Sequence, residues 1–334
     1  GAPGAGAGPL QRVGAGASLR RRRRRRQQAL TASDAPPSPP ATPASIPQAV
    51  PLAQAPEDSG AEACAELMAR LREGGEVARR AVEDVQSSVH RLTFEPAGCR
   101  AVQLALLVAD RGGAAGIAAG LHGHVRAALA SPHGNYVVQK IVETVPVEVS
   151  SFVVEELTGA GLEAARHRYG CRIMCRLLEH SSDDAKTAAL VREALAQAEE
   201  ICRHTFAHHV VEAVLEHGPP EQRHRVAEAL LGDLQRNARN RNASHVLEKA
   251  LEFCSEVDRQ ALADGLCSNP DGVASLAQSH FGTHIVRALV RLPGYAQPVL
   301  EQLRAALPEV QACKHGQRLL LELGLQAQAA GGEP

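Results

Sequence analysis

A short residue pattern recurs along this chain at nearly constant intervals, and this periodicity restricts the fold more than any other feature. Each copy has a small residue, a variable residue, a planar residue, two apolar residues and a usually polar residue. After one spacer, two more apolar residues usually follow. Counted from the variable residue, the seven copies begin at positions 99, 135, 171, 208, 244, 283 and 317. A near-constant period of this length is typical of stacked supersecondary units, none of which can bury its apolar face alone.

The spacing inside each copy predicts an α-helix, because its apolar residues fall on one stripe at helical periodicity. A second helical pattern lies between copies, at residues 153–157, 189–195 and 226–231. The pair Pro219 and Pro220 before the last of these fits a helix start. Each unit is therefore expected to contain a short helix, the patterned helix and a longer outer helix.

Composition agrees with an all-α repeat array. Hydrophobic residues make up 44% of the 334 residues, but aromatic residues only 2%, so the core must consist mainly of Ala, Leu and Val. Such a core suits closely packed helices better than a β-sandwich. The eight scattered cysteines show no disulfide framework and are interpreted as reduced, intracellular thiols. No apolar run reaches the ~18 residues of a membrane span and no signal peptide is evident, so no membrane association is expected.

The chain is expected to have four segments. Residues 1–60 are rich in Gly, Ala, Pro and Ser and are expected to be a disordered tail. Residues 61–87 are expected to form a helical N-terminal cap, 88–324 the repeat domain, and 325–334 a flexible C-terminus. The tail contains seven consecutive arginines at 20–26, which fit a solvated tail, a nuclear-localisation signal or a non-specific phosphate contact.

Charge is unevenly distributed. The formal net charge is −1, but residues 1–60 hold eight arginines against three acidic residues, a net +5. The other residues hold 28 basic and 34 acidic side chains, a net −6. If the folded part binds nucleic acid, it must therefore use a local patch and base contacts instead of overall charge.

The planar position holds only side chains that can lie flat against a base, by aromatic or guanidinium stacking. Lys, Asp, Glu and Ser are absent from it. Because this position avoids the buried stripe, it is expected to form an exposed ladder. The seven planar residues are Arg100, Tyr136, Arg172, His209, His245, His284 and Arg318.

Two edge positions flank the first apolar pair and the planar residue. They lie four residues apart, so they share one helix face, which is also expected to be exposed. Amide pairs can satisfy the donor and acceptor of one base edge, and a carboxylate accepts from guanine. The edge pairs are Cys99 with Gln103, Asn135 with Gln139, Cys171 with Cys175, His208 with Glu212, Ser244 with Glu248, Thr283 with Arg287, and Gln317 with Leu321.

Segments 134–140 (GNYVVQK) and 244–249 (SHVLEK) resemble the repeat motif of the Pumilio (PUF) family, and the resemblance covers roughly residues 88–324. It implies a right-handed α-solenoid, a crescent of about seven three-helix repeats, whose concave face binds single-stranded RNA antiparallel to the chain. The function it implies is sequence-selective RNA binding and post-transcriptional, translational regulation of mRNA through its 3′ UTR. The resemblance also implies a cytoplasmic monomer acting through effector proteins that the sequence does not identify, without catalysis or cofactor.

The resemblance also implies bases for individual repeats. Cys99 with Gln103 is similar to an adenine reader, Asn135 with Gln139 to a uracil reader, and Ser244 with Glu248 to a guanine reader. Cys175 stands where an adenine-reading pair would have Gln, and the pairs beginning at 208, 283 and 317 match no assigned base. The implied target is 5′-NNGN(A)UA-3′.

Several alternatives remain open. One is a low-specificity nuclear or nucleolar RNA-binding relative in ribosome biogenesis. Another is a protein-binding solenoid of the armadillo or HEAT kind, whose face would not need a planar residue in every repeat. No phosphate loop, nucleophile elbow or HExxH helix is found, so no enzyme is expected. No metal site is expected either, although Cys171 with Cys175, and Cys202, His204, His208 and His209, hold ligand types that zinc uses.

Overall fold

The computed structural model describes residues 57–269 and 271–325, all within one unit spanning Pro43–Pro334. In this part of the chain the backbone forms helices and their connections, without a strand. The arginine run at 20–26 and most of the two expected terminal segments lie outside the described residues. Of the residues in those two segments, 57–60 are described and belong to the first helix, and Leu325 is described and buried.

Seven helices carry the repeated pattern, and they are called the ladder helices here. Six of them begin at the small residue of their copy, as the periodicity predicts, and the seventh begins two residues earlier. The ladder helices are α4 (Gly98–Val108), α7 (Gly134–Thr144), α10 (Gly170–Ser181), α13 (Ala207–His217), α16 (Ala243–Phe253), α19 (Gly282–Arg291) and α22 (Lys314–Glu322).

Two further helices accompany most ladder helices, which confirms the expected three-helix unit. A short helix precedes the ladder helix and a longer outer helix follows it. The outer helices are α5 (Arg111–Ala119), α8 (Val147–Leu157), α11 (Ala185–Leu195), α14 (Pro220–Leu231), α17 (Glu256–Cys267) and α20 (Ala296–Ala305). The short helices are α6 (Val125–Ala130), α9 (Gly161–Arg166), α12 (Ala198–Arg203), α15 (Leu234–Arg239), α18 (Gly272–Gln278) and α21 (Leu307–Gln311).

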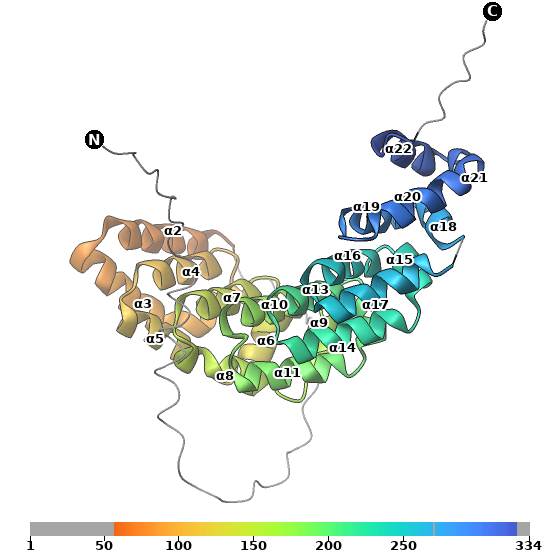
Figure 1. Ribbon diagram of the computed structural model, residues 1–334. Helices are drawn as coiled ribbons and strands as arrows, with labels where there is room; N and C mark the ends of the chain where they lie inside the picture. Colours follow the sequence, from red (N-terminus) through yellow and green to blue (C-terminus); the bar gives the residue numbers. More distant parts are fainter. Residues whose placement is uncertain (1–56, 270, 326–334) are drawn as a thin grey trace, which may run out of the picture. The chain divides into compact units, whose positions relative to one another are not determined.

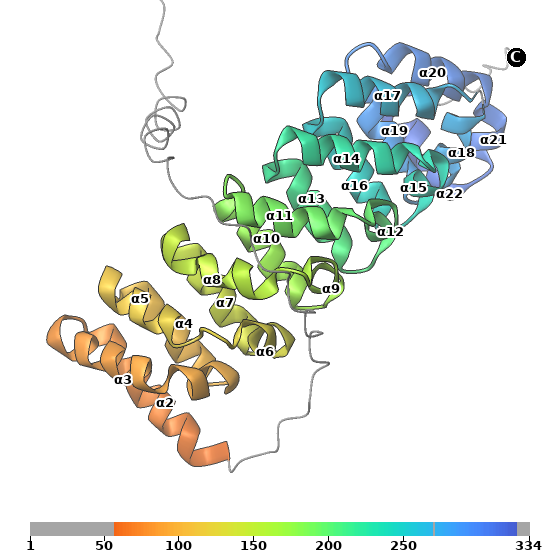
Figure 2. The ribbon, with the colours of Figure 1, turned by 90° about the horizontal axis from the view of Figure 1, so that it is seen from below.

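Equivalent helices of successive repeats stack into rows. Each ladder helix contacts the next from α4 to α22, and the outer helices contact one another from α5 to α17. Figure 1 shows the ladder helices along one side of the array, and Figure 2 shows the outer helices from the other side. Each short helix packs against its own ladder helix and, from α6 to α18, against the outer helix of its repeat. The fold is therefore a solenoid, as expected.

Two longer helices precede the first ladder helix: α2 (Glu57–Glu73) and α3 (Gly75–Phe94). Both pack against α4, so they cover the end of the array. Helix α2 begins four residues before the expected boundary at 61. The expected boundary between residues 87 and 88 falls inside α3, whose last turns take the place of the short helix of the first repeat.

Apolar stripes of the ladder helices form one continuous core. In α7, for example, Val137, Val138, Ile141 and Val142 are each 2% exposed or less. Burying such a side chain contributes about 1.5–3 kcal/mol, and each stripe is covered by the neighbouring repeats. Stability is therefore shared between repeats, as expected for a solenoid.

The small residue that opens each pattern allows a close approach between backbones. At Gly134 an added Cβ would lie 2.9 Å from the Cα of Ala128, and at Gly98 it would lie 2.5 Å from the carbonyl oxygen of Leu92. Both neighbours lie six residues earlier, in the preceding helix. The small residue thus sets the packing of each ladder helix against the helix before it.

Glutamates on two outer helices bind the start of a neighbouring segment. Glu156 accepts hydrogen bonds from the backbone N–H of Gly123 and Val125, at 2.7 and 2.9 Å. Glu193 does the same for Gly159 and Gly161, at 2.9 Å each. The two carboxylates satisfy N–H groups at the starts of α6 and α9 that have no partner within the helix.

None of the helices in the described part is both long and apolar enough to cross a bilayer. The eight cysteines are all described and all free, and five of them are buried.

Candidate nucleic-acid interface

The planar position is the third residue of the first six ladder helices, and it points away from the buried stripe. Six of the seven planar side chains are exposed, and His284 is half-buried. Among them, the aromatic ring of Tyr136 is 43% exposed. The structure therefore confirms the expected exposure for six of the seven planar residues.

Planar side chains of adjacent repeats lie within reach of one another. Nη1 of Arg172 donates a hydrogen bond to Oη of Tyr136 at 3.2 Å, and its Cζ lies 6.0 Å from the ring centroid. The ring centroids of His245 and His284 are 6.4 Å apart. Stacked bases repeat every ~3.4 Å, so one base between two planes needs about twice that distance. The 6.4 Å separation is close to this distance, but the two ring planes are tilted by 49°, so the rings must turn before a base can stack between them.

The first edge position is buried in six repeats, which corrects the expectation that both edge positions line the exposed face. The buried residues are Cys99, Asn135, Cys171, His208, Ser244 and Thr283. Only Gln317 in the last repeat is exposed.

Burial of the first edge follows from its place at the second residue of the helix, where its side chain turns back to the preceding turn. Nδ2 of Asn135 donates to the carbonyl of Ser131 at 2.8 Å, and Oγ1 of Thr283 donates to the carbonyl of His280 at 2.8 Å. The equivalent side chains in the other repeats make similar contacts with backbone carbonyls. These bonds fix the side chains before any ligand arrives.

The second edge position is half-buried in six repeats, so it is the more accessible of the two. Nε2 of Gln139 donates to Oδ1 of Asn135 at 3.0 Å, so the two edge residues of α7 form a connected amide pair. Nε2 of Gln103 donates to the carbonyl of Cys99 at 3.0 Å. In the last repeat the position holds Leu321, which is 60% exposed and cannot hydrogen-bond through its side chain.

A capping residue that the sequence reasoning missed lies four positions before the first edge. Nδ1 of His167 accepts hydrogen bonds from the backbone N–H of Tyr169 and Gly170, both at 3.2 Å. Oδ1 of Asn240 accepts in the same way in the fifth repeat. The capping residues are Ser131, His167, His204, Asn240, Ser279 and Cys313. A hydrogen-bond acceptor at constant offset was the signal that could have revealed them.

A hollow of about 430 Å³ lies on this face, lined by side chains of the second to fourth repeats that include Gln139, Arg172, Cys175 and His209. Its size is within the range of small-ligand pockets. Burial, and then the neighbouring Cys171 and Glu179, raise the pKa of the Cys175 thiol to about 12. The thiol therefore stays protonated and donates to the carbonyl of His209 at 3.5 Å.

At the C-terminal end, one carboxylate binds two arginines of the face. Glu322 accepts from Nε of Arg287 at 2.8 Å and from Nε of Arg318 at 3.0 Å. The hydrogen bonds from these arginines hold the pKa of Glu322 below its usual range. The planar Arg318 and the edge Arg287 are thus tied together by an acidic residue.

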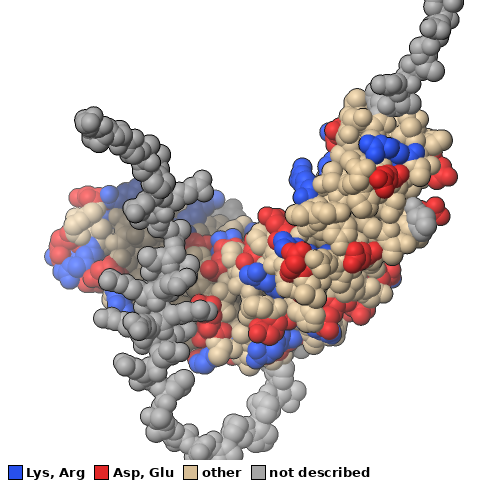
Figure 3. Space-filling view, in the orientation of Figure 1, with Lys and Arg blue, Asp and Glu red and all other residues tan. Residues whose placement is uncertain are grey.

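Charge on the surface is mixed. In the view of Figure 3, Lys and Arg are interspersed with Asp and Glu and do not gather into one basic field. This agrees with the acidic balance of residues 61–334, so attraction of a polyanion must depend on local contacts.

Comparison with known sequences identifies the repeats. The sequence model described as the Pumilio-family RNA binding repeat matches residues 131–158, 162–193, 197–231 and 238–267, which correspond to the second to fifth repeats. The chain is 25% identical over 227 residues to a putative chloroplastic Pumilio homolog 7 of Arabidopsis thaliana, across 66% of this chain and 34% of that protein. It is 24% identical to Pumilio homolog 9 of the same plant, across 71% and 42% respectively. The chain thus spans less than half the length of these relatives.

Solved structures share the fold. The chain of PUF-8 in complex with PBE-RNA superposes with a TM-score of 0.69 and 23% identity, covering 74% of this chain and 73% of that one. The Puf3 RNA binding domain bound to site A of the Cox17 RNA 3′ UTR recognition sequence gives a TM-score of 0.71 and 19% identity, covering 79% and 84%. At such identities the likeness establishes the solenoid fold.

Proposed function

We propose that this chain, which belongs to the Pumilio family of repeat proteins, binds single-stranded RNA along its ladder helices, about one base to each repeat. The exposed row of planar side chains is the observation that carries the proposal. Stacking on such side chains is worth about 1–3 kcal/mol per base. A protein-binding solenoid would have no physical reason to repeat a planar residue at this position.

Selectivity is proposed for the repeats whose edge pairs can match a base edge. The amide of Gln139, which the buried Asn135 holds in place, offers a donor and an acceptor to a base, which suits uracil. The carboxylate of Glu248 beside Ser244 suits the donors of guanine, and Cys99 with Gln103 suits adenine. The proposed target is 5′-NNGN(A)UA-3′, with the C-terminal repeats at the 5′ end.

The biological role proposed from these properties is post-transcriptional regulation of mRNA in the cytoplasm, through partner proteins. A less selective RNA-binding role is the second candidate. It is favoured by the last two repeats, where Glu322 holds Arg287 and Arg318 and where Leu321 offers no base-edge partner.

Selection from a random single-stranded RNA pool with the full chain tests the proposal. The selection is expected to enrich a motif that ends in UA at its 3′ end and has G four positions before that final A. A variant with Tyr136, His209 and His245 all replaced by Ala serves as the control and should enrich nothing. Binding without any enriched motif would favour the less selective role, and absence of binding would overturn RNA recognition altogether.

A further inference from the structure

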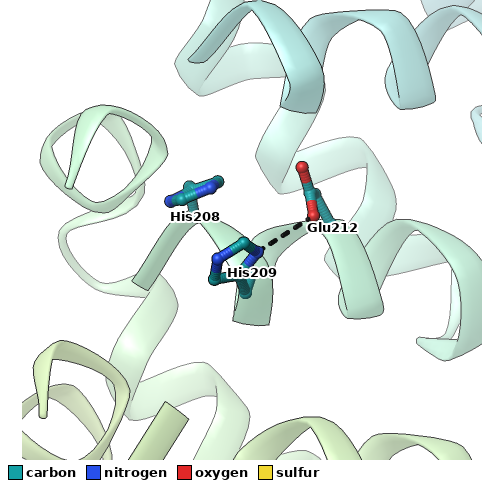
Figure 4. Close-up of side chains that lie close together, drawn as sticks. All are labelled: His208, His209 and Glu212. Atoms are coloured by element: carbon teal, nitrogen blue, oxygen red, sulfur yellow. Dashed lines mark hydrogen bonds and ion pairs between the residues drawn. The ribbon is translucent and has the colours of Figure 1, made fainter. Parts of the chain in front are cut away.

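Three potential metal ligands converge at the start of α13, in the fourth repeat. A nitrogen of His208, a nitrogen of His209 and a carboxylate oxygen of Glu212 all lie within 4.8 Å of one another. Figure 4 shows the three side chains together on this helix. Glu212 is three residues after His209 and four after His208, so its side chain is a neighbour of both along the helix.

His208 is already oriented as metal-binding histidines are. Its Nδ1 lies 2.9 Å from the backbone carbonyl oxygen of His204. Because a carbonyl oxygen only accepts, Nδ1 carries the proton and the lone pair is on Nε2. Metal-binding histidines commonly donate their other N–H to a backbone carbonyl in this way.

Glu212 and His209 complete the donor set. The Glu212 side chain is 18% exposed, and one of its oxygens lies 3.4 Å from Nδ1 of His209. Two imidazoles and one carboxylate form a three-ligand set that zinc uses in proteins, with its fourth position open. The half-buried carboxylate supplies the negative charge that a divalent cation requires.

The Cys and His residues that the sequence offered as zinc ligands do not all come together at one site. Cys202 is buried in the core, where burial raises the pKa of its thiol to about 12. Nδ1 of His204 accepts the backbone N–H of Phe206 and Ala207, so this nitrogen is occupied as a cap. Among residues 57–269 and 271–325, His208, His209 and Glu212 are the one such group of three.

We propose that the fourth repeat binds a divalent transition-metal ion of the zinc class through His208, His209 and Glu212. The same residues are the planar and edge positions of this repeat, so the ion and a base exclude each other there. This second part rests on the proposed RNA binding. An array of otherwise similar repeats would thereby contain one repeat whose base contact depends on metal concentration.

Titration of the full chain with Co²⁺ or Zn²⁺ in the absence of RNA tests the site itself. Co²⁺ gives visible absorption bands that report low-coordinate nitrogen and oxygen ligands, and calorimetry gives the stoichiometry. The test variant is His208→Asn with Glu212→Gln, because Asn135 and Gln139 occupy these places in α7 of the same fold. The control is His284→Arg, because Arg fills the planar position of three other repeats.

One ion per chain is expected for the wild type and the His284 control, with affinity reduced roughly tenfold or more in the double variant. Circular dichroism verifies folding. If the double variant does not fold, Glu212→Gln alone provides the same comparison. Absence of binding to the wild type, or equal binding by the double variant, would overturn the site.

A second titration separates the two parts of the proposal. Zn²⁺ should weaken RNA binding by the wild type and leave that of the double variant unchanged. If the ion binds but RNA affinity does not respond, the exclusion of ion and base is wrong. If the chain binds no RNA at all, the proposed function fails while the Co²⁺ result still decides the site.

Discussion

Nη1 of Arg172 donates a hydrogen bond to Oη of Tyr136 at 3.2 Å, which links the planar positions of the second and third repeats. The guanidinium group also lies 6.0 Å from the centre of the tyrosine ring. The two side chains are thus held near one another without ligand, so they lose less conformational freedom when a base stacks on them.

Tyr136→Ala is expected to weaken binding to all RNA targets alike, by about 1–3 kcal/mol, because it removes a stacking plane and no base-edge contact. Fluorescence anisotropy with short RNA oligonucleotides measures the effect. Tyr136→Phe is the matched control, since it retains the ring and removes only the bond to Arg172, and its loss of affinity should be clearly smaller than that of Tyr136→Ala. A loss confined to one RNA sequence would contradict a stacking role.

Exchange of the fifth-repeat edge pair should change one base preference. Replacing Ser244 by Asn and Glu248 by Gln reproduces the pair of α7, in which Nε2 of Gln139 donates to Oδ1 of Asn135. The preferred base at the third position of the target should change from G to U, since a carboxylate acceptor is replaced by an amide. Competition binding with the four single-base variants of one oligonucleotide measures this. An unchanged preference would show that this pair does not contact the base.

Glu322→Gln is expected to strengthen RNA binding, because it removes a negative charge and frees Arg287 and Arg318 for the RNA backbone. Each further phosphate neutralised should steepen the dependence of log affinity on log salt by about 0.7. Binding measured over a series of salt concentrations provides both values. Glu301→Gln removes the same charge from α20, an outer helix. It should change neither the RNA affinity nor its dependence on salt. Equal effects of both substitutions would point to overall charge alone.

Most of the fold could be predicted from the sequence, because the same spacing recurs in every repeat. One helix could be mistaken, but seven copies with a constant apolar stripe have few alternative packings. The boundaries between segments were harder to predict from the sequence. Helix α3 (Gly75–Phe94) runs through the expected boundary at 87, since its last turns already serve the first repeat in place of a short helix.

The site was predicted less completely than the fold. Periodicity identifies which residues share a helix face, but whether a face is covered depends on the preceding turn. Asn135 and Thr283 are buried because their side chains bond to carbonyls of that turn, and no sequence pattern reports this. His167 was missed because its capping role is recognised only when it is compared with the hydrogen-bond acceptors at the same offset in the other repeats.

His167 should make folding stability depend on pH. Burial, and then Arg168, lower its pKa in the folded state, and protonation of Nδ1 would abolish both hydrogen bonds that it accepts from Tyr169 and Gly170. Because the unfolded chain binds the proton more readily, this contribution is complete above about pH 6.5 and is lost as the pH falls below that value. His167→Asn should reduce the loss, because Asn240 performs the same capping with an amide oxygen that does not titrate.

Urea unfolding of the wild type and His167→Asn, near neutral pH and about one to two pH units lower, tests this prediction. The variant should lose less stability on acidification than the wild type, while equal losses would place the sensitivity in other groups, such as His204, His208 or His284, whose pKa values burial also lowers.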